Sequence, residues 1–290
     1  MVLRCIFFFL LCLFFVSGSG CGIRVWSVRG YEREFEAVEK AFDAAAERPA
    51  SEQASEFRLV ANMYQGLIDK GIRSGQLYYN QGNAWFYAGE RGRAIAAYRI
   101  ALRYLPNDAR ILANLRTASG ITNETKINSD PNNTSSIQME SGDGILAAER
   151  VPFFEYLFFW QNRLGVYEKV LCSQIFAIVL FVSGLLVLFL RQRFRRVFLR
   201  FSVVVFVLTL ISVVSVAYDW YRFECFSYVV VSVETAEPRK GNSLQYDKAF
   251  IKPVPFGSTA IIIGERGDWL HLRFGESQDG WLQKTQVVRY

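Results

Sequence analysis

The side chains that most often carry out catalysis or bind metals are few in this chain and far apart. There is one histidine, His271, and three of the five cysteines (Cys5, Cys12 and Cys172) lie within apolar runs. His271 stands between two leucines in an alternating segment, so we expect it on the outer surface of a strand, away from any nucleophile. A Ser-His or Cys-His pair, a zinc site and a phosphate-binding loop are therefore not predicted. The sequence favours a protein that is not an enzyme and that needs no cofactor or metal.

The cysteine with the most specific context is Cys21. Residues 1–21 contain one basic residue, a short apolar run and then small residues, which is the pattern of a signal peptide. The apolar run is too short to cross a hydrocarbon core of about 30 Å. The tripeptide that ends at Cys21 resembles the end of a bacterial lipobox, although Gly18 stands where a larger aliphatic residue is usual. Acylation of Cys21 and ordinary signal cleavage both remain open, and an uncleaved anchor would leave the following domain on the same side.

Two apolar runs flank a cluster of five arginines. Residues 170–190 and 201–221 each have about the 20 residues that a membrane-spanning helix needs. The arginines lie in residues 191–200, and basic residues in short loops stay in the cytoplasm. The pattern predicts a transmembrane hairpin with a cytoplasmic basic loop, so both soluble parts are expected outside the cytoplasm. This cluster also accounts for the formal charge of +6, so no nucleic acid partner is expected.

The segment before the hairpin is rich in aromatic residues. Amphipathic rings prefer the headgroup level of a bilayer, so residues 150–169 predict an interfacial helix on the outer leaflet. A core helix of the preceding domain is the alternative. Residues 119–149 are polar and without periodicity, which is typical of a flexible linker.

Residues 31–118 have helical periodicity, with a helix boundary at Pro49. Within them, GQLYYNQGNAWFYAGERGRAIAAYRIALRYLPND (residues 75–108) matches the tetratricopeptide repeat. The positions that define the repeat are Gly82, Ala84, Ala94, Tyr98, Ala101 and Pro106. One period of about 34 residues upstream, Arg48 falls under Gly82, so the first repeat is degenerate. Residues 108–118 predict a closing helix, and such a short array is typical of a binding module.

In a tetratricopeptide repeat the first helix of each pair lines the concave face. This rule places Gln76, Tyr79, Asn83 and Phe86 on that face. Tyr79 and Asn83 are one helical turn apart, so an aromatic ring and an amide can contact an extended peptide together. For Phe86, packing against the neighbouring helix is the alternative.

Residues 226–290 change to a period of two. Short β-branched or alternating runs are separated by turns that contain Gly, Asp or Ser, which predicts a small all-β barrel. Trp269 after Gly-Asp, and the later pair Gly280 and Trp281, resemble the corresponding positions of bacterial SH3 domains.

Taken in order, these segments resemble the BatE-like tetratricopeptide proteins of bacterial aerotolerance operons. The resemblance covers nearly the whole chain and is sharpest over LYYNQGNAWFYAGERGRAIAAYR, with departures at Gln81, Trp85 and Ile100. It implies a multidomain membrane protein with all-α tetratricopeptide hairpins, two transmembrane helices and a C-terminal SH3-like barrel. It further implies the bacterial inner membrane as location, with both soluble domains in the periplasm.

Two functions follow as expectations. The first is a scaffold whose helical repeat binds exported protein partners, and the resemblance implies von Willebrand A-domain membrane proteins and a MoxR-type ATPase system. The second is a cell-wall sensor that binds peptidoglycan through the SH3 domain. In both, the lipid bilayer is itself a partner of the chain.

Overall fold

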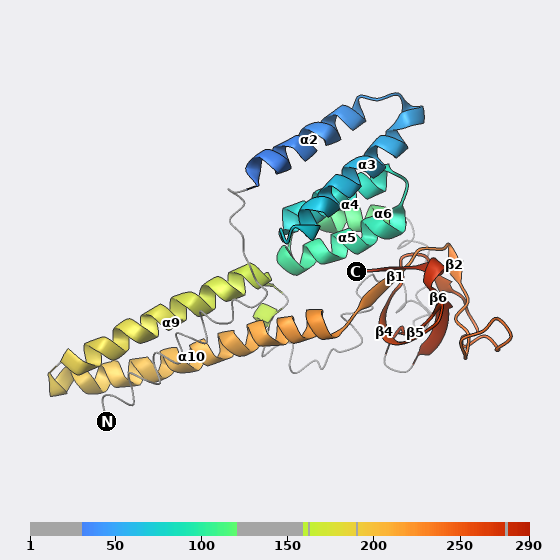
Figure 1. Cartoon of the computed structure of the whole chain (residues 1–290). Coiled ribbons are helices and arrows are strands. Elements are labelled where there is room, and N and C mark those ends of the chain that lie inside the picture. Colours follow the sequence, from blue (N-terminus) through green and yellow to red (C-terminus); the bar gives the residue numbers. More distant parts are fainter. Residues whose placement is uncertain (1–30, 121–158, 162, 190, 276–277) are drawn as a thin grey trace, which may run out of the picture. The chain divides into compact units, whose positions relative to one another are not determined.

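The computed structural model describes residues 31–120, 159–161, 163–189, 191–275 and 278–290 (Figure 1). These residues are mostly helical, with two long apolar helices and a C-terminal antiparallel sheet, and at this level the sequence prediction is confirmed. The chain divides into two compact units, of which one contains the apolar helices and the other the remaining helices and the sheet. The expected signal peptide with Cys21, nearly all of the expected linker, and residues 150–158 of the aromatic segment lie outside the described residues.

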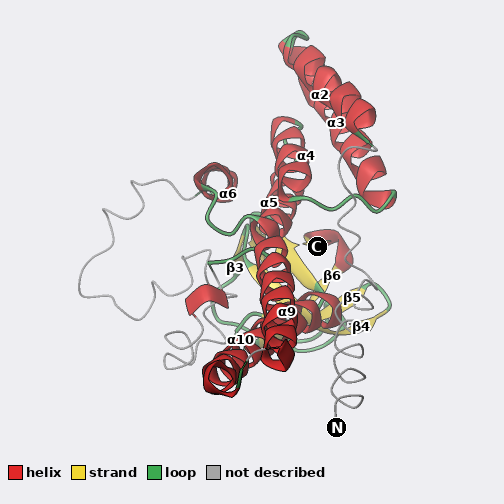
Figure 2. Ribbon diagram, turned by 90° about the vertical axis from the view of Figure 1, so that its left-hand side faces the viewer, coloured by secondary structure: helices red, strands yellow, loops and turns green. Residues whose placement is uncertain are grey.

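Five helices follow one another in residues 31–120 and form the helical array. They are α2 (Glu32–Ala46), α3 (Ala50–Asp69), α4 (Gly75–Tyr87), α5 (Arg91–Tyr104) and α6 (Ala109–Ser119). Each helix packs against the next along the chain, and α2 and α3 lie side by side in Figure 2. Capping side chains fix two helix starts: Ser74 Oγ accepts a hydrogen bond from Leu77 N, and Asp108 Oδ1 accepts one from Arg110 N. The tight turn between α4 and α5 requires the left-handed backbone of Gly89, with φ of 78°.

Of the residues that define the expected repeat, all except Pro106 are buried in the array. Ala84, Ala94 and Ala101 are fully buried, and Tyr98 is 1% exposed. Gly82 lies against the face of the Tyr98 ring, where an added Cβ would be 2.5 Å from Cε1. Small residues at these positions allow α4 and α5 to approach closely, because any larger side chain would overlap its neighbour.

A buried amide on α4 is bonded to a side chain of α3 beside this core. Gln81, one of the positions that depart from the family pattern, is 5% exposed. Its Nε2 donates a hydrogen bond of 2.8 Å to Gln65 Oε1 of α3. The buried amide is therefore satisfied by a neighbouring helix, which removes most of the cost of burying it.

The C-terminal sheet contains five antiparallel strands in the order β6-β5-β4-β1-β7. Their bounds are β1 (Tyr228–Val231), β4 (Thr259–Arg266), β5 (Trp269–Arg273), β6 (Asp279–Gln283) and β7 (Val287–Arg289). A two-stranded ribbon of β2 (Thr235–Ala236) and β3 (Val254–Pro255) packs on the same core, and a short 3-10 helix η5 (Lys284–Gln286) precedes β7. Leu270, Leu272 and Leu282 are fully buried in that core. Gly280 has no room for a side chain, because a Cβ there would be 2.6 Å from Pro238 Cβ.

Strand β1 is buried on both faces. Val229 and Val231 point into the core of the sheet, whereas Val230 is fully buried in the core of the helical array. Alternate residues of a strand point to opposite faces, so the second apolar face of β1 needs a cover, and α5 supplies it. Just beyond β1, Ser232 lies so close to α5 that a Cβ on Gly92 would be 2.8 Å from Ser232 Cβ.

Arginines of α5 complete this contact. The Arg103 guanidinium lies 5.7 Å from the centre of the Tyr228 ring and 5.4 Å from that of Tyr290, and burial lowers the pKa of Arg103. At the other end of the helix, Arg91 lies 4.5 Å from the centre of the Phe256 ring. Stacking on aromatic rings offsets part of the free-energy cost of removing water from these guanidinium groups. The array and the sheet therefore share one continuous contact.

The other unit is a pair of long helices, α9 (Val166–Phe189) and α10 (Gln192–Cys225), which lie side by side (Figure 1). A short 3-10 helix, η4 (Phe159–Gln161), lies upstream. The stretches Val166–Val187 and Phe194–Cys225 are long and apolar enough to cross a membrane. Only 17% and 6% of their most apolar stretches are buried, whereas the core helix of a soluble protein would be mostly covered.

The prediction of a basic loop over residues 191–200 is wrong, because the loop is much shorter. Helix α10 begins at Gln192, so nearly all of that segment is the first part of the helix. Arg191 caps it, since its carbonyl oxygen accepts hydrogen bonds from the backbone N–H groups of Phe194 and Arg195. Arginine is a good helix former, and its long side chain can reach the aqueous boundary from a helical position. The start of the first helix was also placed too late, because α9 includes Val166–Lys169 from the expected interfacial segment.

The contact between α9 and α10 has the spacing of a coiled coil. On α9, the buried residues and some of the half-buried ones form a series with alternating steps of four and three: Lys169, Ser173, Phe176, Leu180, Ser183 and Val187. This 3.5-residue period keeps one face of the helix towards its partner. Ser202 Oγ of α10 donates to Ser183 Oγ at 3.0 Å, and Lys169 Nζ donates to Asp219 Oδ2 at 2.5 Å. The pair Lys169 and Asp219 is almost completely buried, with side chains 4% and 8% exposed.

Candidate binding face of the helical array

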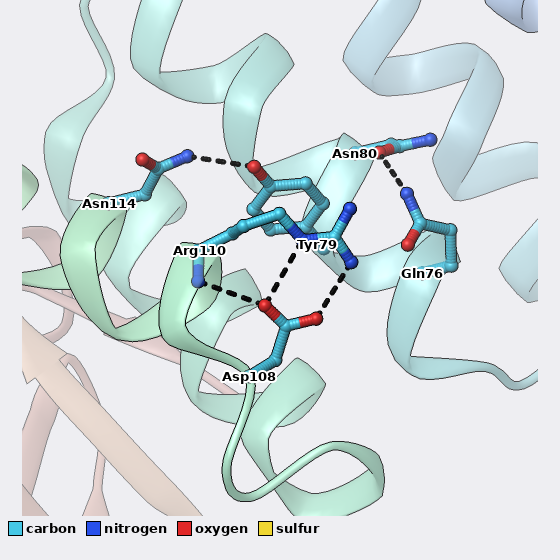
Figure 3. A network of polar contacts seen from close by, with 6 residues as sticks. All are labelled: Gln76, Tyr79, Asn80, Asp108, Arg110 and Asn114. Atoms are coloured by element: carbon cyan, nitrogen blue, oxygen red, sulfur yellow. Dashed lines mark hydrogen bonds and ion pairs between the residues drawn. The ribbon is translucent and has the colours of Figure 1, made fainter.

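Helix α4 brings two of the four expected contact residues together with a residue of α6. Asn114 Nδ2 donates hydrogen bonds to Asn83 Oδ1 at 2.8 Å and to Tyr79 Oη at 3.3 Å; the bond to Tyr79 is drawn in Figure 3. Tyr79 and Asn83 lie one turn apart on α4, as their spacing requires. All three side chains are half-buried, so each has one side in the protein and another side accessible.

Asn83 has a second, structural task. Its Oδ1 also accepts a hydrogen bond of 2.8 Å from the hydroxyl of Tyr98, the buried ring that packs against Gly82. Burial raises the pKa of Tyr98, which therefore stays a hydrogen-bond donor at physiological pH. The carbonyl oxygen of Asn83 thus joins α4 to both α5 and α6, a role that the sequence did not indicate.

Arg110 of α6 covers the ring of Tyr79. Its guanidinium carbon lies 5.3 Å from the ring centre, and its Nη2 and Nε donate to Asp108 Oδ2 at 2.7 Å and to Asp108 Oδ1 at 3.2 Å (Figure 3). This two-point hydrogen bond holds the pKa of Asp108 below its usual range. A guanidinium held by a carboxylate and stacked on a ring has few rotamers left, so it presents its remaining N–H groups in a defined direction.

Gln76 lies one turn before Tyr79, and its Nε2 donates to Asn80 Oδ1 at 2.9 Å (Figure 3). Six residues of α4 and α6 together form a surface that we call the polar face: Gln76, Tyr79, Asn80, Asn83, Arg110 and Asn114. Three of these, Asn80, Arg110 and Asn114, were not expected from the sequence. A signal for Arg110 existed, because it stands 34 residues after the expected residue Gln76.

The fourth expected residue, Phe86, belongs to a separate aromatic group. Its ring packs edge-on against Tyr87, with centroids 5.9 Å apart, and Tyr87 stacks on the buried Phe57 at 4.9 Å. Phe42 of α2 contacts both Phe57 and Tyr87. Phe86 is half-buried among these rings, whereas Tyr87 is 57% exposed. Tyr87 is thus the aromatic residue of this group that a partner would meet first.

The C-terminal sheet carries one further arrangement of interest. His271 and Trp281 pair across β5 and β6, with rings stacked 4.7 Å apart at an interplanar angle of 2°. They lie on the face opposite Leu270, Leu272 and Leu282, so His271 points away from the core of the sheet as predicted. Two residue pairs further along the same strands, Arg273 and Asp279 form a two-point hydrogen bond.

Within the part of the chain that the structure describes, no group of three His, Cys, Asp or Glu side chains is placed to hold a metal ion. The geometry of the polar face is that of a contact surface of amides, a ring and a guanidinium. Such groups recognise the backbone and polar side chains of another chain by hydrogen bonding. In comparisons with protein-family models, curated proteins and solved structures, no match to this chain was found.

Proposed function

We propose that this protein is a non-enzymatic, membrane-anchored scaffold in which the helical array is a tetratricopeptide module that binds a protein partner. The observation that carries the proposal is the polar face. Its side chains are joined by hydrogen bonds within α4 and between α4 and α6, yet they remain partly accessible. Side chains that are already ordered lose less conformational entropy on binding, so this surface is prepared for contact with another chain.

In the proposed arrangement α9 and α10 cross the membrane as a hairpin. The contacts of α5 with β1 and β7 support it, because they require the array and the sheet to lie on one side of the bilayer. These two parts flank the hairpin in the sequence, so the chain between them must cross an even number of times. The arginines at the start of α10 favour the cytoplasm for the turn, which leaves both soluble parts on the extracytoplasmic side.

The partners that the family resemblance suggests are von Willebrand A-domain membrane proteins of an aerotolerance-type envelope complex, which acts with a MoxR-type ATPase. Amide side chains on the polar face suit the backbone of an extended segment of such a partner, since the hydrogen bonds within the face use neither the donor Asn83 Nδ2 nor the acceptor Asn114 Oδ1. Arg110 adds a preference for a carboxylate or a carbonyl oxygen, because its exposed N–H groups are donors only.

The sharpest test removes accessible side chains of the polar face without touching its buried hydrogen bonds. Gln76→Ala with Arg110→Ala changes two residues at equivalent positions of α4 and α6. Asn62→Ala with Arg116→Ala is the matched control, since it removes an amide and a guanidinium from exposed positions of α3 and α6 outside the polar face. We expect the first double variant to weaken partner capture by about 2 kcal/mol, the scale of a binding hot spot.

The measurement is quantitative mass spectrometry of the proteins that co-purify with the full chain from detergent-solubilised membranes. A deletion of residues 22–118 sets the background. Proteins that depend on the array but are captured equally by both double variants would contradict the assignment of the polar face.

The topology and the fate of Cys21 are tested independently. A reporter that is active only outside the cytoplasm should be active when fused after Tyr290 and inactive when inserted at Gln192. The reverse pattern would contradict the proposed hairpin. If Cys21 is acylated, a fatty-acid analogue labels the protein and Cys21→Ala abolishes the label, whereas an unlabelled wild type indicates signal cleavage or a retained N-terminal run.

The stacked pair His271 and Trp281 favours a second candidate function, binding of peptidoglycan by the sheet as a bacterial SH3 domain. A flat aromatic surface is suited to the apolar face of a sugar ring or to a peptide bond. Retention of the full chain on purified sacculi, lost in Trp281→Ala and kept in Gln278→Ala, would support this function. Equal retention of all three proteins would refute a role for the pair.

A further inference from the structure

A groove of about 220 Å³ runs between α9 and α10 near the start of α10. It is lined on α9 by Ile178, Val182 and Leu186, and on α10 by Phe198 and Phe201. Ser183 also reaches the groove, but its hydroxyl is already joined to Ser202 and to the backbone of α9. The surface of the groove is therefore apolar, because the Ser183 hydroxyl is already hydrogen-bonded within the protein. A molecule bound there must be apolar where it contacts these residues.

Positive charge lies close to this groove along the chain. Arg195 stands one turn before Phe198 on α10, and Arg191 precedes the helix by one residue, at the spacing that continues the same face. Both arginine side chains are exposed. The sequence contains no Asp or Glu between Glu168 and Asp219, so no carboxylate of this segment can neutralise them. The anion that balances these charges must come from outside the hairpin.

We infer that the groove binds an anionic phospholipid, with an acyl chain against Val182 and Phe201 and the phosphate at Arg191 and Arg195. This inference rests on the proposed membrane hairpin. A phospholipid supplies both required parts in one molecule, since its charged head is joined to its apolar tail. Along α10, Arg195 and Phe201 are about 9 Å apart, which is a separation that a glycerol backbone and the first methylenes of a chain can span.

The two arginines favour an anionic phospholipid over a zwitterionic one. A zwitterionic lipid also carries a phosphate, but its own cation competes with the two guanidinium groups. An anionic lipid leaves its phosphate fully available, and basic pockets between transmembrane helices on the cytoplasmic side are known to bind such headgroups. The arginine end of the hairpin is the cytoplasmic end in the proposed topology, so the lipid comes from the cytoplasmic leaflet.

The experiment uses the full chain reconstituted in phosphatidylcholine bilayers with spin-labelled phosphatidylglycerol or spin-labelled phosphatidylcholine. The measured quantity is the preference of the protein for the anionic label. Arg195→Gln should lower the preference by about fivefold, the effect expected for one arginine at a membrane surface. Arg195→Lys keeps the charge and should retain most of it.

A substitution that fills the groove separates a binding site from general surface charge. Val182→Trp places an indole in the groove without changing any charge, and Leu186→Phe is a smaller alternative at the same place. Leu185→Trp is the matched control, because Leu185 is exposed on the same helix but does not line the groove. We expect both groove-filling variants to lose the preference and the control to keep it.

Each outcome bears on a different part of the inference. If the groove-filling variants keep the preference of the wild type, the arginines act only as surface charge and the lipid site is refuted. If inserted wild-type protein shows no preference, the site is likewise refuted while the hairpin stands. Extraction of the protein from the vesicles by alkaline carbonate would instead refute the proposed membrane insertion, and with it the basis of this inference.

Discussion

Replacement of Gly82 by alanine tests whether the close approach of α4 and α5 holds the helical array together. A Cβ at this position would be 2.5 Å and 2.6 Å from Cε1 and Cδ1 of Tyr98. The ring cannot move aside easily, because it is 1% exposed and its hydroxyl is bonded to Asn83. Overpacking of this kind costs about 1–3 kcal/mol, and the better helix propensity of alanine returns roughly 0.5–1 kcal/mol. We expect a net destabilisation of about 1–2 kcal/mol.

Gly66 provides the matched control. It lies within α3, and an added Cβ there would meet nothing within 4 Å. Gly66→Ala therefore gains helix propensity without a clash and should stabilise α3 by about 0.5 kcal/mol. The two substitutions are chemically identical, so a difference in sign between them isolates the contact with Tyr98.

The assay is hydrogen exchange of the full chain in detergent, read by mass spectrometry on peptides of α3, α4 and α5. A loss of 1.4 kcal/mol corresponds to about tenfold faster exchange through local opening. We expect this acceleration in α4 and α5 of Gly82→Ala and slightly slower exchange in α3 of Gly66→Ala. If exchange in Gly82→Ala is no faster than in Gly66→Ala, the reasoning from close packing is refuted.

Three further substitutions have expected outcomes. Asn83→Ala should speed exchange in α4 and α5, because the buried Tyr98 hydroxyl loses its acceptor at a cost of about 1–3 kcal/mol, whereas Asn83→Asp keeps an acceptor. Lys169→Leu should destabilise the α9–α10 pair by about 3–5 kcal/mol, because it leaves Asp219 buried without this partner. The double variant Lys169→Leu with Asp219→Leu should recover most of this loss. Both effects are measured by energy transfer between labels on the two helices as the SDS concentration is raised. Arg103→Ala should loosen the contact of α5 with the sheet by about 1 kcal/mol and speed exchange in β1 and β7.

Each of these three predictions can be contradicted by a particular result. Unchanged exchange in Asn83→Ala would mean that Tyr98 finds another acceptor. A double leucine variant as unstable as Lys169→Leu would show that packing, and not an uncompensated charge, sets the loss. Faster exchange throughout the sheet of Arg103→Ala, including β5 and β6, would indicate unfolding of the sheet instead of a loosened contact.

Local spacing accounts for the part of the fold that the sequence predicts. Local burial produces a 3.6-residue period in helices, a two-residue period in strands and a long apolar run in the two apolar helices. These elements can therefore be predicted from the sequence. The same holds for Gly82, a repeat position at which the two helices are expected to approach closely. The limit appears at helix ends: α10 begins at Gln192 because arginines are good helix formers, whereas the expected boundary followed the change in polarity.

Contacts between distant segments leave a weaker signal. Nothing near Lys169 identifies Asp219 as its partner, since the two are 50 residues apart. Val230 is part of a continuous apolar run, which indicates a strand covered on both faces but does not name the cover. Arg110 could have been predicted, because the repeat period relates it to the expected residue Gln76, but no expected residue stands one period before Asn114. The expected face therefore lacked Asn80 of α4 and the residues that α6 contributes.

The contact of α5 with β1 and β7 has a consequence for the order in which this protein is made. Strand β7 begins about 180 residues after α5 ends, which at roughly 5–20 residues per second is a delay of about 10–40 s. Until both Ser232 and Val288 have been synthesised, the surface around Gly92 lacks its complete cover, although α4 and α6 already exist. The completed sheet of a neighbouring copy has the same complementary surface, so this delay favours exchange of sheets between copies.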